Sequence, residues 1–302
     1  MAETNNITRA SEKLNVAQTA LGQQIRHLEE KLGVELLVRH SRGISLSEAG
    51  RALYRHAVAI LQAVDEAQRD VSALGKAKKE VVNLGVTPSI QALIGPEFSL
   101  AAETELPQMS LRMVEELSFV LIDALLRGDL DLVLAYEFDE RPGLVTVPLV
   151  EEELLFIAGA GVSLPEGPMR FHDVVRTDLA LVSERDIVWR LMRAAADKLS
   201  LDINVAFEVQ SMPAIKTLVA RGAATSVVPY GVAAEEIAHG LIVARPIVDP
   251  SIRRRLFLSH RAERLPFMNE RKLVVFLEKM VRRLAEKMQP YGSLIGGGLT
   301  DI

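Results

Sequence analysis

The spacing of apolar residues near the amino terminus predicts two short helices. Four apolar positions are separated by four, three and four residues, which places them on one face of a helix. They are Leu21, Ile25, Leu28 and Leu32. Ala10 and Leu14 share a face in a preceding segment, and Asn15 and Val16 form a tight joint between the two. Helices joined in this way are typical of a helix-turn-helix, although other helical hairpins have the same geometry.

The next segment has the pattern of a two-stranded hairpin. Apolar residues at 36–37 and 44–46 flank a turn that carries two arginines, Arg39 and Arg42. Apolar runs on both sides of a short turn are typical of a β-ribbon. Directly after a helix-turn-helix, such a ribbon is interpreted as a wing.

A long helix is predicted after Ser47, whose hydroxyl can accept hydrogen bonds from the backbone N–H groups of the first turn. Its apolar residues follow a heptad pattern, with spacings that alternate between four and three. They are Leu53, Ala57, Ile60, Val64, Ala67, Val71 and Leu74. Such a helix either packs on its own domain or pairs with a second copy, and the sustained period favours a dimer. Gly75 and the charged residues up to Lys79 end the helix.

From residue 81 onwards, short apolar strands alternate with helical patterns. The expected strands are 81–86, 110–114, 130–136, 154–158, 179–183, 205–209, 224–228, 241–243 and 256–259. The first expected helix follows the strand 81–86 and ends at about residue 104. The other expected helices span 118–127, 187–199, 212–221 and 267–288. This order predicts βαβ units, a parallel sheet covered on both faces, and two small α/β lobes with a ligand cleft between them. The residues from Pro290 onwards are expected to form a loose tail.

The charge of the chain is segregated. The 302 residues carry 35 Lys and Arg against 40 Asp and Glu, a formal charge of −5, so any contact with nucleic acid must be local. Residues 97–166 contain fifteen acidic and three basic residues, whereas residues 253–287 contain eleven basic and four acidic ones. These blocks are either solvated faces or neighbours in the fold.

Composition also limits the compartment and the chemistry. The chain has no cysteine, which excludes disulfides, thiol nucleophiles and cysteine-ligated metal centres. No apolar stretch is long enough to span a membrane, and the first ten residues are too polar for a secretory signal. We therefore expect a soluble, cytoplasmic protein.

Enzyme signatures are missing from the sequence. The six histidines include no close pair at metal-ligand spacing, and neither a Walker loop nor a Gly-x-Ser-x-Gly elbow occurs. Residues 159–161 lack the third glycine of a dinucleotide fingerprint, and adjacent carboxylates such as Glu151-Glu152-Glu153 usually leave one member in solvent. We expect no catalytic residue, no metal site and no cofactor.

Two hydroxyls mark a possible ligand site. Thr87 and Ser89 follow the first strand of the α/β region, where the next helix presents its first N–H groups. This arrangement suits a carboxylate or a similar anion, although Ser89 could equally be an ordinary helix cap. Glu137 follows a later strand at the same edge of the sheet, where it would oppose an anion or pair with a cationic group of the ligand.

Several short motifs together resemble the amino-terminal signature of LysR-type transcriptional regulators. They are Ala17 to Ile25, Leu28-Glu29, Leu32-Gly33, Leu36-Leu37-x-Arg39, Arg42-Gly43 and Ser47-x-Ala49-Gly50. The resemblance continues through the long helix, through residues 128–132 and through Val219-x-x-Gly222, so it covers nearly the whole chain. Residues 51–73, with Tyr136-Glu137, look closest to the nitrogen assimilation control and cysteine regulator branch.

The resemblance implies a domain plan. A winged helix-turn-helix (residues 1–50) would be joined by a dimerising linker helix (48–76) to an effector-binding domain (81–288). That domain would resemble two-lobed periplasmic binding proteins, with a second lobe at about 162–265, and residues 289–302 would form a flexible tail. The implied function is a sequence-specific regulator that binds promoter DNA as a homodimer or homotetramer and responds to a small-molecule effector.

The resemblance also implies roles for single residues. The recognition helix would run from Gln18 to about Lys31, and its early turns would enter the major groove because Glu29, Glu30 and Glu35 would repel phosphate. The residues expected at DNA are Gln18, Thr19, Gln23, Arg26, Arg39 and Arg42. The residues expected at the effector are Thr87, Ser89, Tyr136, Glu137 and Ser211.

The sequence departs from the family pattern in several places. Thr19 replaces the usual proline, Gly22 the usual serine, and Ala224 the usual second glycine after Val219. Family members also carry a helix before the position of Thr8, where only Met1–Ile7 remain here. Loss of about four buried apolar side chains at ~1.5–3 kcal/mol each would remove much of a domain's stability. We expect that the true start lies upstream. The alternative is a cytoplasmic ligand-binding dimer without DNA binding.

Overall fold

The computed structural model describes residues 7–14, 16–40, 43–74, 79–136 and 141–295. The chain divides into two compact units, residues 1–77 and 78–302, which are described separately. Asn15 of the expected joint lies outside the described residues, as does the segment before Ile7 on which the expectation of an incomplete first helix rests.

The first unit contains the predicted helix pair, ribbon and long helix. Its elements are α1 (Ile7–Leu14), α2 (Gln18–Leu32), β1 (Leu37–His40), β2 (Gly43–Leu46) and α3 (Glu48–Leu74). Helix α2 ends at Gly33, which has the positive φ of 71° that glycine adopts without strain. The Oγ atom of Ser47 accepts the N–H of Gly50 at 2.9 Å, as predicted for the cap of α3.

The apolar face of α2 is only partly covered. Leu21 is buried and Ile25 is half-buried, but Leu28 and Leu32 are exposed. The shared face of these four residues is therefore covered only in the first half of the helix.

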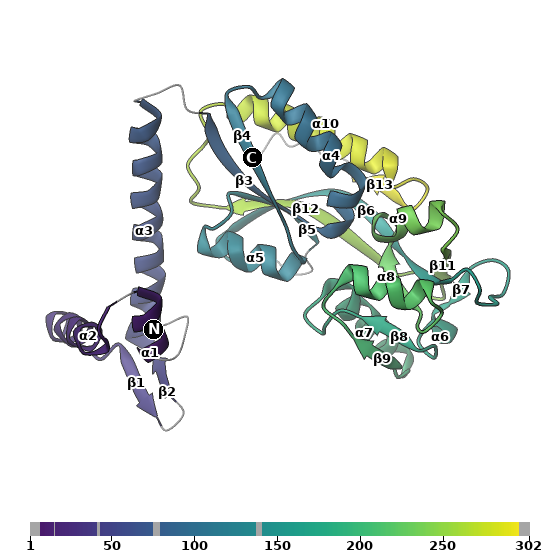
Figure 1. The fold of residues 1–302 in the computed structure, drawn as a ribbon, viewed down its shortest axis with the longest axis horizontal. Coiled ribbons are helices and arrows are strands. Elements are labelled where there is room, and N and C mark those ends of the chain that lie inside the picture. The colour runs from purple at the N-terminus through teal and green to yellow at the C-terminus, as the bar shows by residue number, and fades with distance from the viewer. Residues whose placement is uncertain (1–6, 15, 41–42, 75–78, 137–140, 296–302) are drawn as a thin grey trace. The chain divides into compact units, whose positions relative to one another are not determined.

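The second unit is built on a mixed sheet (Figure 1). The strand order is β4-β3-β5-β12-β6-β11-β7, and β10 and β13 also pair with β6. The strands are β3 (Glu80–Val86), β4 (Met109–Glu115), β5 (Leu132–Tyr136), β6 (Leu144–Gly159), β7 (Met169–Arg170), β10 (Ser226–Pro229), β11 (Ile242–Val248), β12 (Arg253–Arg261) and β13 (Gly292–Leu294). β3, β4 and β5 are parallel, but β12 runs antiparallel to both β5 and β6. The prediction of a wholly parallel sheet was wrong because the chain returns to the first lobe through β12.

Helices cover both faces of the first lobe (Figure 1). α4 (Pro88–Glu105) and α10 (Glu270–Lys287) pack on one face, where Phe98 and Phe276 meet edge to face with ring centroids 5.0 Å apart. α5 (Ser118–Arg127) packs on the other face, where Leu121 and Ile122 join Val133 and Ala135 of β5 in a separate apolar cluster.

The second lobe adds shorter elements around the far end of β6. They are α6 (Phe171–Val174), β8 (Leu179–Leu181), α7 (Ile187–Leu199), β9 (Val205–Glu208), α8 (Met212–Ala220) and α9 (Tyr230–Ala238). The sequence pattern missed α6, β7 and α9, and it found only the second half of the sixteen-residue β6. The predicted end of this lobe at 265 lies too far along the chain, because β12 pairs with β5 in the first lobe.

The residues after α10 are not all a loose tail. β13 pairs antiparallel with Val150–Glu152 of β6, and the N–H of Ile295 donates to the carbonyl of Leu149 at 2.9 Å. This part of the predicted tail is therefore corrected to a strand. The segment is too short to be recognised from its own sequence, because it becomes a strand by pairing with an edge of β6. Residues 296–302 lie outside the described residues.

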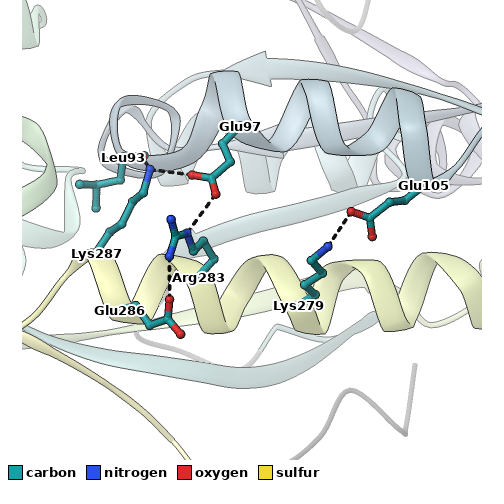
Figure 2. A network of polar contacts seen from close by, with 7 residues as sticks. All are labelled: Leu93, Glu97, Glu105, Lys279, Arg283, Glu286 and Lys287. Carbon is teal, nitrogen blue, oxygen red and sulfur yellow. Dashed lines mark hydrogen bonds and ion pairs between the residues drawn. The ribbon is translucent and has the colours of Figure 1, made fainter.

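The oppositely charged blocks of the sequence meet in the fold (Figure 2). Glu97 of α4 pairs with Arg283 at 3.0 Å and with Lys287 at 2.7 Å, both on α10. Lys279 pairs with Glu105 at 2.6 Å on the same two helices. These ion pairs confirm the second of the two predictions, that the acidic and basic blocks are neighbours in the fold.

Candidate DNA-binding and effector sites

Helix α2 presents a polar face to solvent. The side chains expected to contact DNA on this helix are exposed, whereas Leu21 is buried. They are Gln18, Thr19, Gln23 and Arg26. Amide and guanidinium groups of this kind can hydrogen-bond to base edges in a major groove. The helix thus combines an anchored apolar side with a polar side that is open to a ligand.

Glu29 has a structural role that the sequence did not reveal. Its Oε1 atom accepts the backbone N–H groups of Leu36 and Leu37 at 2.8 and 3.2 Å. The carboxylate therefore fixes the start of β1 to α2. This role is additional to the expected repulsion of phosphate by Glu29, Glu30 and Glu35, of which Glu30 and Glu35 are exposed.

The predicted wing is an antiparallel two-stranded ribbon. In its register Leu37 lies opposite Leu46 and Arg39 opposite Ile44. Arg39 is thus a residue of β1, and Arg42 lies outside the described residues. The ribbon follows α2 directly, as a wing requires.

Helix α3 carries apolar residues on its surface. Leu53 and Ala57 are half-buried, but Ile60, Leu61 and Val64 are 64%, 65% and 46% exposed. Ala67, Val71 and Leu74 continue the heptad within α3, but their side chains lie outside the described set. Exposed apolar side chains at heptad spacing form a surface suited to a second helix.

A narrow cavity lies between the two lobes of the second unit. It offers about 40 Å³ to the centres of water molecules. One wall comes from the first lobe and contains Thr87, Ser89 and Ser118; the other contains Asp186 and Trp189. Thr87 and Ser89 thus lie where the sequence expected an effector.

The other expected effector residues have different positions. Tyr136 is buried beneath the cavity wall, and its ring lies under the guanidinium of Arg254. Ser211 caps α8, where its Oγ accepts the N–H of Ala214 at 3.4 Å. It is not among the residues that line the cavity. Glu137 lies outside the described residues.

Ser89 is not a helix cap. The cap position of α4 is Thr87, which makes no side-chain hydrogen bond to the helix backbone. The hydroxyls of Thr87 and Ser89 instead lie 3.2 Å apart in a hydrogen bond with each other. The first turn of α4 therefore faces the cavity without a side-chain cap.

The residue that the sequence missed in this site is Arg254. Its Nε and Nη2 atoms donate to Oε1 of Glu152 at 2.9 and 2.7 Å, and Nη2 also donates to Oγ of Ser89 at 3.1 Å. The guanidinium lies 3.4 Å from the centroid of the Tyr136 ring. The available signal was the run of three arginines, which matches the run of three glutamates at 151–153, but neither run identifies the member that turns inwards.

Burial controls the ionisation of this cluster. Burial, followed by the charge of Glu152, raises the pKa of Tyr136, so the phenol stays protonated. Burial alone would lower the pKa of Arg254, but the charge and hydrogen bonds of Glu152, with the charge of Asp186, raise it. Burial also raises the pKa of Asp186, against the effect of the N–H groups at the start of α7.

In the described ranges, no group of three or more His, Asp or Glu side chains is arranged to hold a metal ion. None of the helices in these ranges is both long and apolar enough to cross a membrane.

Comparison with known proteins is consistent across the whole chain. Residues 1–51 match the family model described as bacterial regulatory helix-turn-helix protein, lysR family, and residues 75–281 match the LysR substrate binding domain. The regulator BbuR of Bordetella bronchiseptica is 27% identical over 98% of this chain and 92% of its own length. The nitrogen assimilation regulatory protein nac of Klebsiella aerogenes is 29% identical over 77% of this chain and 76% of its own.

Solved structures share the fold. Full-length CbnR in complex with its target DNA has a TM-score of 0.60 and 23% identity, with 94% of this chain and 96% of that chain covered. A mutant of OxyR from Corynebacterium glutamicum has a TM-score of 0.61 and 20% identity, with 95% and 89% covered. At this level of identity the likeness shows the fold alone.

The relatives are transcriptional regulators, a class that acts by binding rather than by catalysis. The family binds promoter DNA and a small-molecule effector and forms oligomers. An exposed polar helix before a winged ribbon, together with a two-lobed domain around a cavity, agrees with the two family matches. The chain belongs to the LysR family of DNA-binding transcriptional regulators.

Proposed function

We propose that α2 reads base edges in the major groove through Gln18, Thr19, Gln23 and Arg26. The observation that carries this proposal is the exposure of these four polar side chains, of which Thr19, Gln23 and Arg26 lie opposite the buried Leu21. Arg39 and Arg42 of the wing contact the phosphate backbone, for which guanidinium groups are well suited. The helix-turn-helix match disfavours the alternative of a ligand-binding dimer without DNA function.

Two copies of the chain pair through α3. The exposed apolar residues Ile60 and Val64 support this assignment, because pairing would remove them from water. By two-fold symmetry the same surface serves both copies and presents two recognition helices to the two halves of an operator.

The cavity between the lobes binds the effector, and Thr87 and Ser89 contribute to its wall. A ligand acts as a switch only if it binds two arrangements of the protein with different affinity, and couplings of ~1–3 kcal/mol are typical. The proposal assigns no catalytic step to the chain, because regulation by binding needs none. It places the protein in the cytoplasm, where promoter DNA is found.

A salt titration of DNA binding tests whether α2 contacts base edges and whether the wing contacts phosphates. Duplexes selected from a random library by the full-length protein provide the specific site, and a scrambled duplex provides the reference. Arg26→Ala is expected to weaken the specific complex by ~1–3 kcal/mol and to reduce discrimination. The double variant Arg39→Ala, Arg42→Ala is expected to weaken binding to both duplexes and to flatten the salt dependence.

Arg271→Ala is the matched control, because Arg271 is an exposed arginine of α10 in the effector unit. Equal affinities and equal salt slopes for wild type and the wing variant would refute the phosphate contacts. Unchanged discrimination in Arg26→Ala would refute base reading by that residue.

Sedimentation velocity tests the pairing surface. Ile60→Asp is expected to shift the protein towards the monomer, because it would bury a charge between two helices. Arg55→Asp places the same charge on the opposite face of α3 and is expected to leave the oligomer intact. An unchanged oligomer in Ile60→Asp would contradict the assignment.

A further inference from the structure

The cavity contains an arginine with donor capacity left over. Nε and Nη2 of Arg254 are engaged by Glu152 and Ser89, but Nη1 makes no hydrogen bond with any residue that the structure describes. Arg254 lines the cavity beside Ser89 and the first turn of α4. A guanidinium N–H, a hydroxyl and the uncapped start of a helix converge here, and all three favour a carboxylate.

The opposite wall contains a buried carboxylate. Asp186 is 8% exposed and lines the same cavity. Its Oδ1 accepts the N–H of Val188 at 2.9 Å, and no side chain of the described residues forms an ion pair with it. The N–H groups at the start of α7 and the charge of Arg254 lower the pKa of this carboxylate, but burial is the larger effect and raises it. Asp186 therefore lacks a cationic partner in direct contact among the described residues, which makes its burial costly. An ammonium group of a ligand would supply that partner, and the indole of Trp189, which also lines the cavity, offers a face to the same cation.

The balance of charge separates the possible ligands. Glu152 and Asp186 are two negative groups, whereas Arg254 is one positive group that is already paired with Glu152. A simple carboxylate anion would add a further negative charge to this cluster. A zwitterion adds no net charge, and it brings a cation to Asp186 at the same time as an anion to Arg254.

The size of the cavity limits the ligand further. A site needs roughly 10–15 Å³ of such space for one water molecule, and this cavity offers about 40 Å³. Room for a few water molecules accommodates a ligand of a few heavy atoms between the two walls.

We propose that the effector is a small α-amino acid, of the size of glycine, alanine or serine, bound as a zwitterion. Its carboxylate accepts hydrogen bonds from Nη1 of Arg254, from Ser89 and from the start of α4. Its ammonium group pairs with Asp186 on the other lobe, so that the ligand links the two lobes. This inference rests on the proposed role of the cavity as the effector site.

Isothermal titration calorimetry of the full-length protein tests the ligand class. Glycine, L-alanine and L-serine are compared with propionate and L-lactate, which lack the ammonium group, and with L-alaninamide, which lacks the carboxylate. At least one amino acid is expected to bind at least tenfold more tightly than all three reference compounds. Equal affinity for propionate or L-lactate, or no heat with any of the three amino acids, would overturn the proposal.

Asp186→Asn tests the predicted ion pair. Asparagine is also a good helix cap, so the variant is expected to fold, which thermal unfolding without ligand checks. It is expected to lose at least tenfold in affinity for the preferred amino acid. Asp197→Asn, which changes an exposed carboxylate of the same helix α7, is expected to bind like wild type. Unchanged affinity in Asp186→Asn would refute the contact.

The DNA titration on the same preparation distinguishes a failure of the ligand class from a failure of DNA binding. A protein that binds its selected duplex but none of the amino acids retains its function as a regulator and refutes only this ligand class. Tight binding of L-lactate would keep the cavity as the effector site and refute the zwitterion. A protein that binds an amino acid but no DNA would instead contradict the proposed reading of α2.

Discussion

Two kinds of arginine–glutamate pair lie side by side on β6 and β12. In the antiparallel register, Arg253, Arg254 and Arg255 lie opposite Glu153, Glu152 and Glu151. The middle arginine side chain is 7% exposed, whereas its two neighbours are 54% and 62% exposed. Successive side chains of a strand point to opposite faces. The same chemistry is therefore placed in the interior once and at the surface twice.

The difference in burial changes what each pair contributes. Removing one member of a buried pair leaves an uncompensated charge in a medium of low polarity, whereas an exposed pair is screened by water and by salt. Only the middle pair reaches the cavity, where Arg254 contacts Ser89 and the ring of Tyr136. The comparison teaches that position on the strand, rather than residue type, separates a site residue from a surface charge.

The largest expected effect is the loss of Arg254. Arg254→Ala leaves Glu152 buried without its partner and is expected to lower the free energy of unfolding by ~3–5 kcal/mol. Urea denaturation of the full chain, followed by far-ultraviolet circular dichroism, measures the change. The double variant Arg254→Met, Glu152→Leu removes both charges and should cost less than Arg254→Ala. A loss below about 1 kcal/mol in Arg254→Ala would mean that the pair behaves like a surface pair.

A much smaller effect is expected one residue along the strand. Arg255→Ala removes an exposed partner of Glu151, and pairs of this kind are worth ~0–1 kcal/mol. The same urea experiment measures the change, and high salt should make wild type and variant nearly equal. If Arg255→Ala destabilised the protein as much as Arg254→Ala, the contrast between the two faces of β12 would be refuted.

Local pattern was sufficient to predict several elements of this fold. The predicted helices 118–127 and 187–199 have the observed bounds of α5 and α7. Their apolar spacing is set within about ten residues of chain, which a sequence displays directly. The ribbon and the cap at Ser47 are local features of the same kind.

The missing parts depend on contacts between distant residues. Arg254 and Glu152 are 102 positions apart, and their pairing requires the register of β12 on β6. Residues 292–294 become a strand only because an edge of β6 is available. For the cavity, sequence indicated Thr87 and Ser89 at the end of a strand, but Asp186 comes from another lobe that no local pattern links to them.

The smallest expected effect lies on the outer surface of α4 and α10 (Figure 2). Hydrogen bonds from Lys287 and then Arg283 lower the pKa of Glu97 below its ordinary value of 4.5. Because the folded-state pKa is depressed, the stabilisation is fully present above the ordinary value and is lost as the pH falls through the folded-state pKa. Glu97→Gln should therefore differ from wild type at pH 7 and approach it at pH 3.

Urea denaturation at the two pH values measures this difference. The difference should also shrink in high salt, because Arg283 is exposed and Lys287 is only half-buried. Glu103→Gln is the matched control, since Glu103 is an exposed residue of α4 that forms no ion pair with the described part of the chain. It should track wild type at both pH values. A gap between Glu97→Gln and wild type that persisted undiminished at pH 3 would mean that Glu97 stabilises α4 through packing. In that case the stability contributed by Glu97 would not come from its ion pairs, and the contrast between the exposed network and the buried Arg254–Glu152 pair would not hold.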